Sequence, residues 1–426
     1  MKVLMFGWEF PPHISGGLGT ACYGLTKGLS HFDLEMIFVV PKSYGDEDQS
    51  FLKIRDAGDV EIDSHFIERK EFWDKLTYLE VESHIKPYIS PEAFETLHET
   101  DKVDVTEMKR KAFSKKFKFT GKYGKNLIEE VYRYSVIAAK VSTEHEFDLI
   151  HSHDWLTYPA GIMAKKVSGK PLVIHVHATE YDRSGDSPNP DVFKIEKQGM
   201  EAADRIIAVS NLTRRIVIEK YGINPDKVVT VHNAVEPYHY KHIDYTRNLK
   251  EKIVTFLGRI TFQKGPEYFV EAAKKVIDKD PNVRFVMAGS GDMMNKMIKR
   301  AAELGITTKF HFAGFLKGED VFKMFSLSDV YVMPSVSEPF GISPLEAMSS
   351  NVPVIVSHQS GVSEILTHAL KVDFWDVDAL SDAIYALLNY KSLANTFSKY
   401  GKIEVENLKW ENAAYKVLQV YKSAIK

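Results

Sequence analysis

Short apolar runs alternate with segments of helical spacing along most of the chain, in two successive series. The runs are nearly continuous in Val, Ile, Leu and Phe, which is typical of parallel strands covered on both faces. The first series comprises Val3–Phe6, Glu35–Val40, Asp148–Ser152, Pro171–His177, Arg205–Val209 and Val228–His232, and the second comprises Ile253–Leu257, Val283–Ala288, Lys309–Ala313, Val330–Met333 and Pro353–Val356. Two such series predict an α/β protein with two doubly wound domains.

A polar and aromatic stretch, Glu236–Lys252, separates the two series and is the expected linker. We therefore expect a first domain over residues 1–240, a second over 241–403, and a final helix over 404–426. Each domain is long enough to bury a hydrophobic core of its own.

One region, residues 41–124, departs from this regular alternation. An acidic half (Glu92, Glu95, Glu99, Asp101, Asp104, Glu107) precedes a basic half (Lys109, Arg110, Lys111, Lys115, Lys116, Lys118, Lys122, Lys125) interleaved with Phe113, Phe117, Phe119 and Tyr123. Such a charge pattern is typical of a solvated insertion. A surface for a polymeric acceptor and a contact of Lys109–Lys125 with an anionic membrane are the alternatives.

Composition favours an ordinary soluble enzyme over a nucleic-acid or membrane protein. The 426 residues carry a net charge of −3, with 27% charged and 44% hydrophobic residues, so no nucleic-acid partner is expected. Cys22 is the single cysteine, which excludes an internal disulfide and favours a reducing compartment. The apolar run at Met1–Phe6 is too short for a signal peptide, so we expect a cytoplasmic location.

The segment Glu338–Glu346 (Glu-Pro-Phe-Gly-Ile-Ser-Pro-Leu-Glu) follows an expected buried strand. Pro344 suits the first turn of a helix and Ser343 is a favourable N-cap, so the second carboxylate lies at a helix start. Free N–H groups there favour a phosphate, and ionised carboxylates accept hydrogen bonds from sugar hydroxyls. The alternative is a solvated loop with a glutamate that complements the helix dipole.

Two further βα loops carry candidate binding groups. The first strand leads into Gly16-Gly17-Leu18-Gly19, where adjacent glycines let backbone N–H groups approach a phosphate or sugar, or simply form a tight turn. After the strand Ile253–Leu257 come Arg259 and Lys264, a pair of cations that suits a diphosphate or is merely a surface feature.

A histidine, His177, ends the fourth expected strand, at the same sheet edge as the glycines. A histidine there serves either a ligand or the structure. The two Asp-x-Asp triplets, Asp46–Asp48 and Asp376–Asp378, lie in a charged loop and before a helix, where Asp376 suits a cap. No metal site is expected at either triplet.

In this order and on these strand ends, the motifs resemble those of retaining GT-B glycosyltransferases of family four, close to the glycogen and starch synthases. The resemblance covers nearly the whole chain. It rests on Gly16–Gly19, on His177 in His-Ala-Thr-Glu, on Gly258-Arg259 with Lys264-Gly265, and on Glu338–Glu346. It implies two Rossmann-like domains facing across a crevice, with the final helix crossing back to the N-terminal domain.

The resemblance also implies a role for each residue. His177, Arg259, Lys264 and Glu338 would be catalytic, and Glu9 and Asp154 would face the acceptor. The donor-binding residues would be Gly16, Gly17, Arg259, Lys264, Phe315, Leu316, Gly341, Ile342, Ser343 and Glu346. The nucleoside-diphosphate sugar is a substrate, and no cofactor or metal is expected. Family retention implies front-face attack, which requires no carboxylate nucleophile.

The implied reaction is transfer of glucose from an adenosine or uridine diphosphate donor to an α-1,4-glucan. Ile14 argues against it, because bacterial glycogen synthases carry a lysine at the position three residues before Gly17. The alternatives are transfer of another sugar to a lipid-linked or cell-envelope glycan, a nucleotide-sugar epimerase of the same fold, and a non-enzymatic nucleotide-sugar sensor. The resemblance leaves the oligomeric state open.

Overall fold

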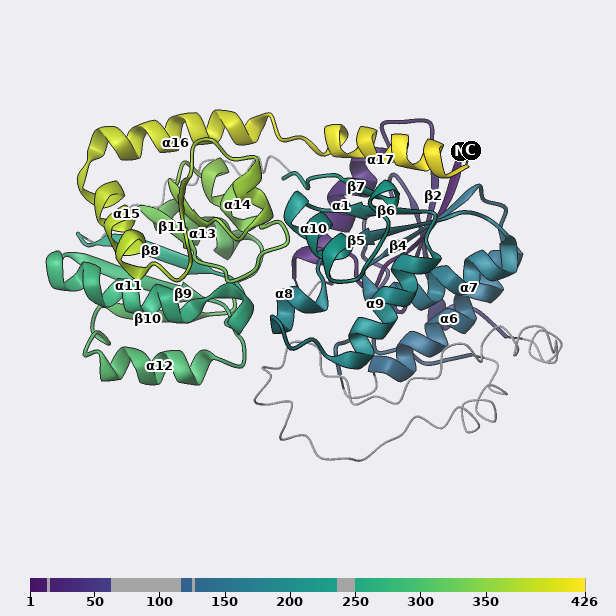
Figure 1. The fold of residues 1–426 in the computed structure, drawn as a ribbon, viewed down its shortest axis with the longest axis horizontal. Coiled ribbons are helices and arrows are strands. Elements are labelled where there is room, and N and C mark those ends of the chain that lie inside the picture. The colour runs from purple at the N-terminus through teal and green to yellow at the C-terminus, as the bar shows by residue number, and fades with distance from the viewer. Residues whose placement is uncertain (14–15, 63–115, 125–126, 236–249, 426) are drawn as a thin grey trace. The chain divides into compact units, whose positions relative to one another are not determined.

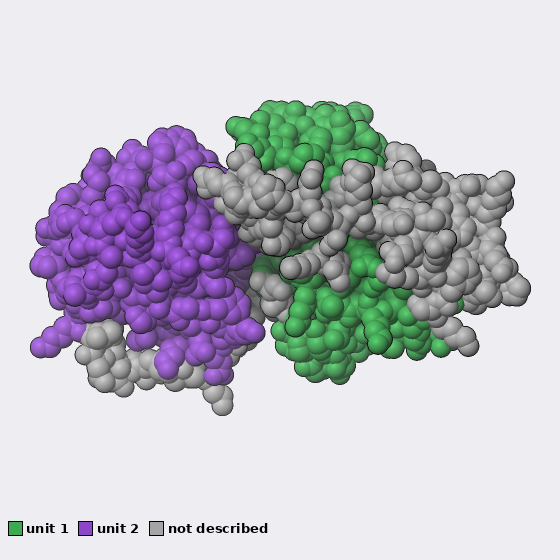
Figure 2. Space-filling view, turned by 90° about the horizontal axis from the view of Figure 1, so that it is seen from below, with its two compact units in different colours: residues 1–181, 186–233, 410–426 green, residues 182–185, 234–409 purple. Residues whose placement is uncertain are grey.

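The computed structural model describes residues 1–13, 16–62, 116–124, 127–235 and 250–425. The chain divides into two compact units, which Figure 2 colours separately. Unit 1 comprises residues 1–181, 186–233 and 410–426, and unit 2 comprises residues 182–185 and 234–409.

Unit 1 contains, in its described residues, a parallel sheet with the strand order β3-β2-β1-β4-β5-β6-β7 (Figure 1). Its strands are β1 (Lys2–Phe6), β2 (Glu35–Val40), β3 (Lys53–Asp56), β4 (Leu149–His153), β5 (Leu172–Val176), β6 (Arg205–Ala208) and β7 (Val228–Thr230). The residues of β1, β2, β4, β5 and β6 are almost all buried, because helices cover both faces of the sheet.

The helices of unit 1 form two layers. One layer contains α6 (Leu127–Glu144), α7 (Tyr158–Ser168) and α9 (Pro190–Ala202), and α7 packs against both of the others. In the other, α1 (Gly17–Leu29) packs against the C-terminal helix α17 (Trp410–Ile425), and α10 (Asn211–Glu219) packs on β6 and β7. A Cβ added at Gly24 of α1 would lie 2.2 Å from the Trp410 ring, so glycine is what permits this close packing. The helix α8 (Glu180–Ser184) follows β5.

Unit 2 contains a parallel sheet with the order β10-β9-β8-β11-β12-β13 in its described residues. The strands are β8 (Lys252–Leu257), β9 (Val283–Ala288), β10 (Phe310–Gly314), β11 (Val330–Met333), β12 (Val354–Ser357) and β13 (Leu370–Val372). The helices are α11 (Pro266–Lys279), α12 (Met294–Glu303), α13 (Glu319–Leu327), α14 (Ser343–Ser349), α15 (Val377–Asn389) and α16 (Lys391–Glu406). Apolar side chains from one face of the sheet and from α11, α12 and α15 form one core cluster of this unit.

Both sheets share the order 3-2-1-4-5-6, to which unit 1 adds β7. The order reverses between β1 and β4 in unit 1 and between β8 and β11 in unit 2, where the paired strands lie side by side. In open parallel sheets, ligands bind outside the carboxyl ends of the strands at this switch point. We therefore expect ligand-binding residues in the loops that follow β1, β4, β8 and β11.

The structure corrects several boundaries expected from the sequence. Residues 53–56, expected in an irregular insertion, form the edge strand β3, and Lys252, expected in the linker, begins β8. The final helix begins at Trp410 rather than at 404, because α16 continues to Glu406. The strands β3 and β13 escape prediction because they are short and only partly apolar.

The aromatic residues of the expected insertion also differ from the prediction. Phe117 and Phe119 are buried in the core of unit 1, and the Phe119 ring contacts Tyr134 edge-on. Neither can serve as an exposed platform for an acceptor. Phe113 lies outside the described residues, as does Lys109–Lys125 except for residues 116–124.

Candidate functional site

The loops after β8 and β11 pack tightly at the switch point of unit 2. Gly265 ends the short helix η5 (Phe262–Lys264) with a φ of 63°, and a Cβ there would lie 2.0 Å from the Pro334 carbonyl oxygen. The backbone carbonyl of Gln263 accepts a hydrogen bond of 2.9 Å from the Val336 N–H. Only glycine satisfies both the left-handed conformation and this approach.

The predicted residues Lys264 and Glu338 are brought together by this packing. The Lys264 ammonium group pairs with the Glu338 carboxylate, whose side chain is only 8% exposed. The Glu338 backbone is in turn held by the Gln359 carbonyl and the Gly361 N–H, each at 2.9 Å. Arg259 lies in the same loop and donates to the Gln263 side chain at 3.4 Å.

The turn from Glu338 into α14 is formed by Gly341, whose φ is 98°, and by Ile342. The prediction of Ser343 as N-cap was wrong by one residue, because Ile342 occupies that position without a side-chain cap. The Ser343 hydroxyl instead bonds the Tyr331 hydroxyl of β11 at 2.8 Å. This contact ties the start of α14 to the neighbouring strand.

Glu346 lies in the first turn of α14 and is partly buried. Desolvation raises the pKa of its carboxyl group to about 7. No hydrogen bond or ion pair joins that carboxyl group to another described residue. It therefore remains available to a ligand hydroxyl.

Phe315 and Leu316 follow β10 at the same carboxyl edge of the sheet. The Phe315 side chain is 55% exposed, and the Lys317 ammonium lies 5.6 Å from its ring centroid. An exposed aromatic ring beside the strand ends provides a flat surface on which a planar base can stack.

In unit 1, Glu9 lies between β1 and α1, Gly16 is the N-cap of α1, and Gly17 begins that helix. The buried Glu9 carboxylate accepts a hydrogen bond of 3.2 Å from the Gly19 N–H. A Cβ added to Gly16 or Gly17 would meet no atom of the described residues within 4 Å, and both residues are exposed. The fold itself therefore does not require glycine at these two positions. The expected departure at Ile14 lies outside the described residues.

Asp154 follows β4, the strand beside β1, and has a φ of 64°. Its buried carboxylate accepts a hydrogen bond of 3.3 Å from the Ala178 N–H, which follows β5. A left-handed conformation is costly for an aspartate, and such strain clusters at functional sites.

His177 is partly buried just after β5, and desolvation lowers the pKa of its imidazole to about 3. Its Nε2 lies 3.1 Å from Nδ1 of His153. Cys22 Sγ and ring nitrogens of these two histidines lie within 4.8 Å of one another. Burial and the nearby carboxylates of Glu9 and Asp154 raise the pKa of the Cys22 thiol.

Sequence reasoning missed the partners of His177. His151, His153 and His175 are all buried on β4 and β5. The signal was present in the two His-x-His patterns, because residues i and i+2 of a strand point to the same face. Because β4 and β5 are neighbours, the two patterns form one cluster.

Carboxylates of both Asp-x-Asp triplets contact groups of the protein itself. The Asp46 carboxylate contacts the His13 ring at 2.8 Å. Asp376 caps α15 by accepting from the Ala379 N–H, which confirms the prediction, and Asp378 pairs with Lys275 at 2.6 Å.

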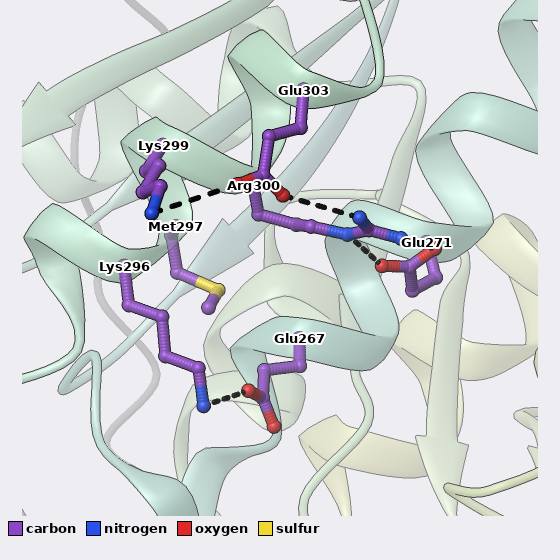
Figure 3. Close-up of a pocket in the computed structure, with 7 residues that line it drawn as sticks. All are labelled: Glu267, Glu271, Lys296, Met297, Lys299, Arg300 and Glu303. Carbon is purple, nitrogen blue, oxygen red and sulfur yellow. Dashed lines mark hydrogen bonds and ion pairs between the residues drawn. The ribbon is translucent and has the colours of Figure 1, made fainter.

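A surface groove between α11 and α12 provides a contrast (Figure 3). Its charged side chains are matched with one another, with Lys296 against Glu267 and Arg300 against Glu271, each at 2.6 Å. None of the predicted site residues lines it. Exposed pairs of this kind contribute little, and they leave no group aimed at a ligand.

No helix among the described residues is both long and apolar enough to cross a membrane.

Comparison with known proteins supports a glycosyltransferase. Residues 241–404 match the family described as Glycosyl transferases group 1, and residues 112–238 match Glycosyltransferase Family 4. An uncharacterized glycosyltransferase of Methanocaldococcus jannaschii is 28% identical over 100% of this chain and 99% of its own. A D-inositol 3-phosphate glycosyltransferase of Rhodococcus jostii is 27% identical over 65% of this chain and 67% of its own.

Solved structures agree on the fold. Sucrose-phosphate synthase of Thermosynechococcus elongatus superposes with a TM-score of 0.72 at 18% identity, covering 99% of this chain and 98% of that one. TarM superposes with a TM-score of 0.70 at 14% identity, covering 99% and 98%. Two parallel sheets of Rossmann order, the matches to both family models and the likeness to these solved structures together support a glycosyltransferase with the GT-B fold, of the family-four type.

Proposed function

We propose that this enzyme transfers a hexose from a nucleoside-diphosphate sugar to a glycan acceptor with retention at the anomeric carbon. The observation that carries the proposal is the Lys264–Glu338 pair at the switch point of unit 2. It joins a cation suited to a phosphate and a carboxylate suited to sugar hydroxyls in one place.

The donor is assigned to the residues of unit 2. Arg259 and Lys264 hold the diphosphate, and Glu346 accepts hydrogen bonds from ribose hydroxyls. Glu338 contacts hydroxyls of the transferred sugar, with backbone N–H groups of Gly341, Ile342 and Ser343 beside it. Phe315 and Leu316 lie near the base. These roles are supported by the exposed Phe315 ring and by the Glu346 carboxyl group, which has no partner among the described residues.

The residues of unit 1 serve the sugar and the acceptor. Gly16 and Gly17 approach the donor phosphate, His177 lies against the donor sugar, and Glu9 and Asp154 face the acceptor. The open space beside both glycines supports the first of these roles. The low pKa of His177 supports the second, because a neutral imidazole accepts or donates a hydrogen bond without adding charge.

The reaction breaks the bond between the anomeric carbon and the diphosphate oxygen. The acceptor hydroxyl oxygen forms the new bond on the same face, and its proton passes to the departing phosphate. Negative charge develops on that phosphate, where preorganised cations lower the barrier most effectively. Arg259 and Lys264 supply this stabilisation in the proposal, so no metal ion is needed at the donor site.

We propose two candidate classes of acceptor. An α-1,4-glucan elongated with glucose is the first candidate, on the resemblance of the Gly7–Pro12, Gly16–Gly19 and His151–Trp155 segments to glucan synthases. The second candidate is a lipid-linked glycan. It is favoured by a relative, an Escherichia coli enzyme named as a galactosyltransferase acting on a GlcNAc-diphosphoundecaprenol, which is 27% identical over 63% of this chain and 73% of its own.

One experiment separates the candidates. The chain is incubated with glucose, galactose and N-acetylglucosamine donors of uridine and adenosine diphosphate, each with maltooligosaccharides or a lipid-diphosphate sugar. Chain lengthening of the maltooligosaccharide supports the glucan assignment, and product on the lipid acceptor supports the second candidate. Tight donor binding without any transfer or hydrolysis would contradict enzymatic function and favour a sensor.

A further inference from the structure

A cluster of histidines lies beneath α1 and α17 in unit 1. His151 and His153 are two residues apart on β4 and so share a face of the sheet, and His153 lies opposite His175 of β5 in the strand register. All three side chains are at most 2% exposed. Ring nitrogens of the three lie within 4.8 Å of one another. Three strong metal-ligating groups therefore converge inside the protein.

The hydrogen bonds of the cluster separate an outer from an inner set of nitrogens. Nδ1 of His151 contacts the Tyr421 hydroxyl of α17 at 2.7 Å, and Nδ1 of His153 contacts Nε2 of His177 at 3.1 Å. By contrast, Nε2 of His151, Nε2 of His153 and both nitrogens of His175 are buried and have no partner among the described residues. Each unsatisfied buried polar group costs about 1–3 kcal/mol.

For His151 and His153 this division matches the pattern of metal-bound imidazoles, and His175 offers a third buried nitrogen without a partner among the described residues. A ligating histidine uses one nitrogen for the metal and its other nitrogen for a hydrogen bond that orients the ring. We propose that His151, His153 and His175 bind one divalent transition-metal ion of the zinc type.

The choice of metal and ligands follows from the chemistry of the donors. Imidazole favours Zn²⁺, Co²⁺, Ni²⁺ or Cu²⁺ over Mg²⁺ or Ca²⁺. With Zn–N bonds of about 2.0–2.1 Å, tetrahedral ligand nitrogens lie about 3.4 Å apart, so binding draws the rings closer together. The overlapping set of Cys22, His153 and His177 is less suitable, because burial and two carboxylates disfavour the Cys22 thiolate.

An ion at this position would link β4 to β5 and would stabilise the fold of unit 1 without taking part in the transfer reaction. It would also fix the ring of His153, whose outer nitrogen contacts His177. The inference is independent of the donor and the acceptor, and its test does not use transfer activity.

The test uses the full chain without a polyhistidine tag, unfolded with chelator and refolded with Zn²⁺, with Co²⁺ or without metal. We expect about one ion per chain after gel filtration, a Tm several degrees above that of the metal-free protein, and the visible absorption of tetrahedral Co²⁺. His175→Ala should lose the ion, because it removes a ligand and leaves both outer hydrogen bonds intact. His31→Ala changes an exposed histidine of the same unit and should keep it.

Several outcomes would overturn the proposal. Wild-type protein refolded with Zn²⁺ that holds less than about a tenth of an ion per chain, with an unchanged Tm, would exclude the site. Full metal content in His175→Ala, or a thiolate-to-Co²⁺ charge-transfer band, would exclude this ligand set. If His175→Ala does not fold, the metal content and Co²⁺ spectrum of the wild type decide the question.

Discussion

The side chains of Lys264 and Glu338, 74 residues apart in the chain, form an ion pair at the point where the strand order of unit 2 reverses. Both charges are largely removed from solvent, with side-chain exposures of 19% and 8%. Without a ligand, the carboxylate neutralises the ammonium group. A bound diphosphate would take over that ammonium group, and sugar hydroxyls would take over the carboxylate. The pair thus couples the two halves of the proposed donor site.

Replacing Lys264 by alanine should lower turnover at saturating donor by about 10²–10³-fold, because a preorganised cation is lost from the leaving phosphate. Arg259→Ala should lower turnover by a similar factor for the same reason. Steady-state kinetics with purified protein provide the measurement. Lys274→Ala is the matched control, since Lys274 is also paired with a carboxylate, Asp278 at 2.6 Å, but on the surface of the same unit. Near wild-type turnover in Lys264→Ala would refute the diphosphate role.

The stability of the ligand-free chain should fall as pH rises from about 4.5 to 7, because the Glu346 pKa of about 7 exceeds the ordinary value of 4.5. The stability that the Glu346 carboxyl group contributes is fully present below the unfolded-state pKa of 4.5. It is lost as pH rises through the folded-state pKa of about 7. The effect is at most about 3 kcal/mol, and less where solvent reaches the partly buried carboxyl group. Urea unfolding of wild type and Glu346→Gln across this range measures it as the difference between the two slopes.

Donor affinity should show the opposite dependence on pH. Ribose hydroxyls donate to the ionised carboxylate, so the donor should bind more tightly as pH rises through about 7. Calorimetry of nucleoside diphosphate with wild type and Glu346→Gln would show this. An identical pH profile in the two proteins would remove Glu346 from the ribose site.

Gly17→Ala should weaken donor binding while changing stability by less than about 1 kcal/mol, because the added methyl group meets no atom within 4 Å in the part of the chain that the structure describes. Gly24→Ala is its counterpart on the same helix. There the methyl group would lie 2.2 Å from the Trp410 ring, so stability should fall by about 1–3 kcal/mol. Thermal unfolding and donor titration of both variants distinguish the ligand-facing glycine from the packing glycine. Unchanged donor affinity in Gly17→Ala would contradict its role.

Brief EDTA treatment of the folded enzyme should leave the transfer rate unchanged, and added Mg²⁺ or Mn²⁺ should not raise it. The reason is that Arg259 and Lys264 provide the charge that a metal ion supplies elsewhere. An ion in the buried histidine site is shielded and should survive a short exposure. The measurement is the initial rate before chelation, after it, and after metal is added back. Complete loss of activity that Mg²⁺ restores would reverse this expectation.

The sequence by itself determined the strands of both sheet centres and the order of the motifs. Central parallel strands are buried on both faces, so their continuous apolar runs can be recognised in the sequence alone. The glycines, Arg259, Lys264 and Glu338 could be predicted for a related reason, because each lies in the segment between such a run and the next expected helix or at the start of that helix. Parallel strands deliver the loops at their carboxyl ends to one edge of the sheet. The edge strands β3 and β13 carry no such signal, because they are short and only partly apolar.

Only the tertiary structure decided which side chains meet. Sequence places Lys264 and Glu338 in separate loops, and their pairing depends on the close approach of Gly265 to Pro334. Ser343 looked like a helix cap, yet its hydroxyl serves Tyr331. The histidines became a cluster only through the register of β4 and β5 and the packing of Tyr421 against them. Local patterns report burial and conformation, whereas contacts between distant residues depend on how the elements pack.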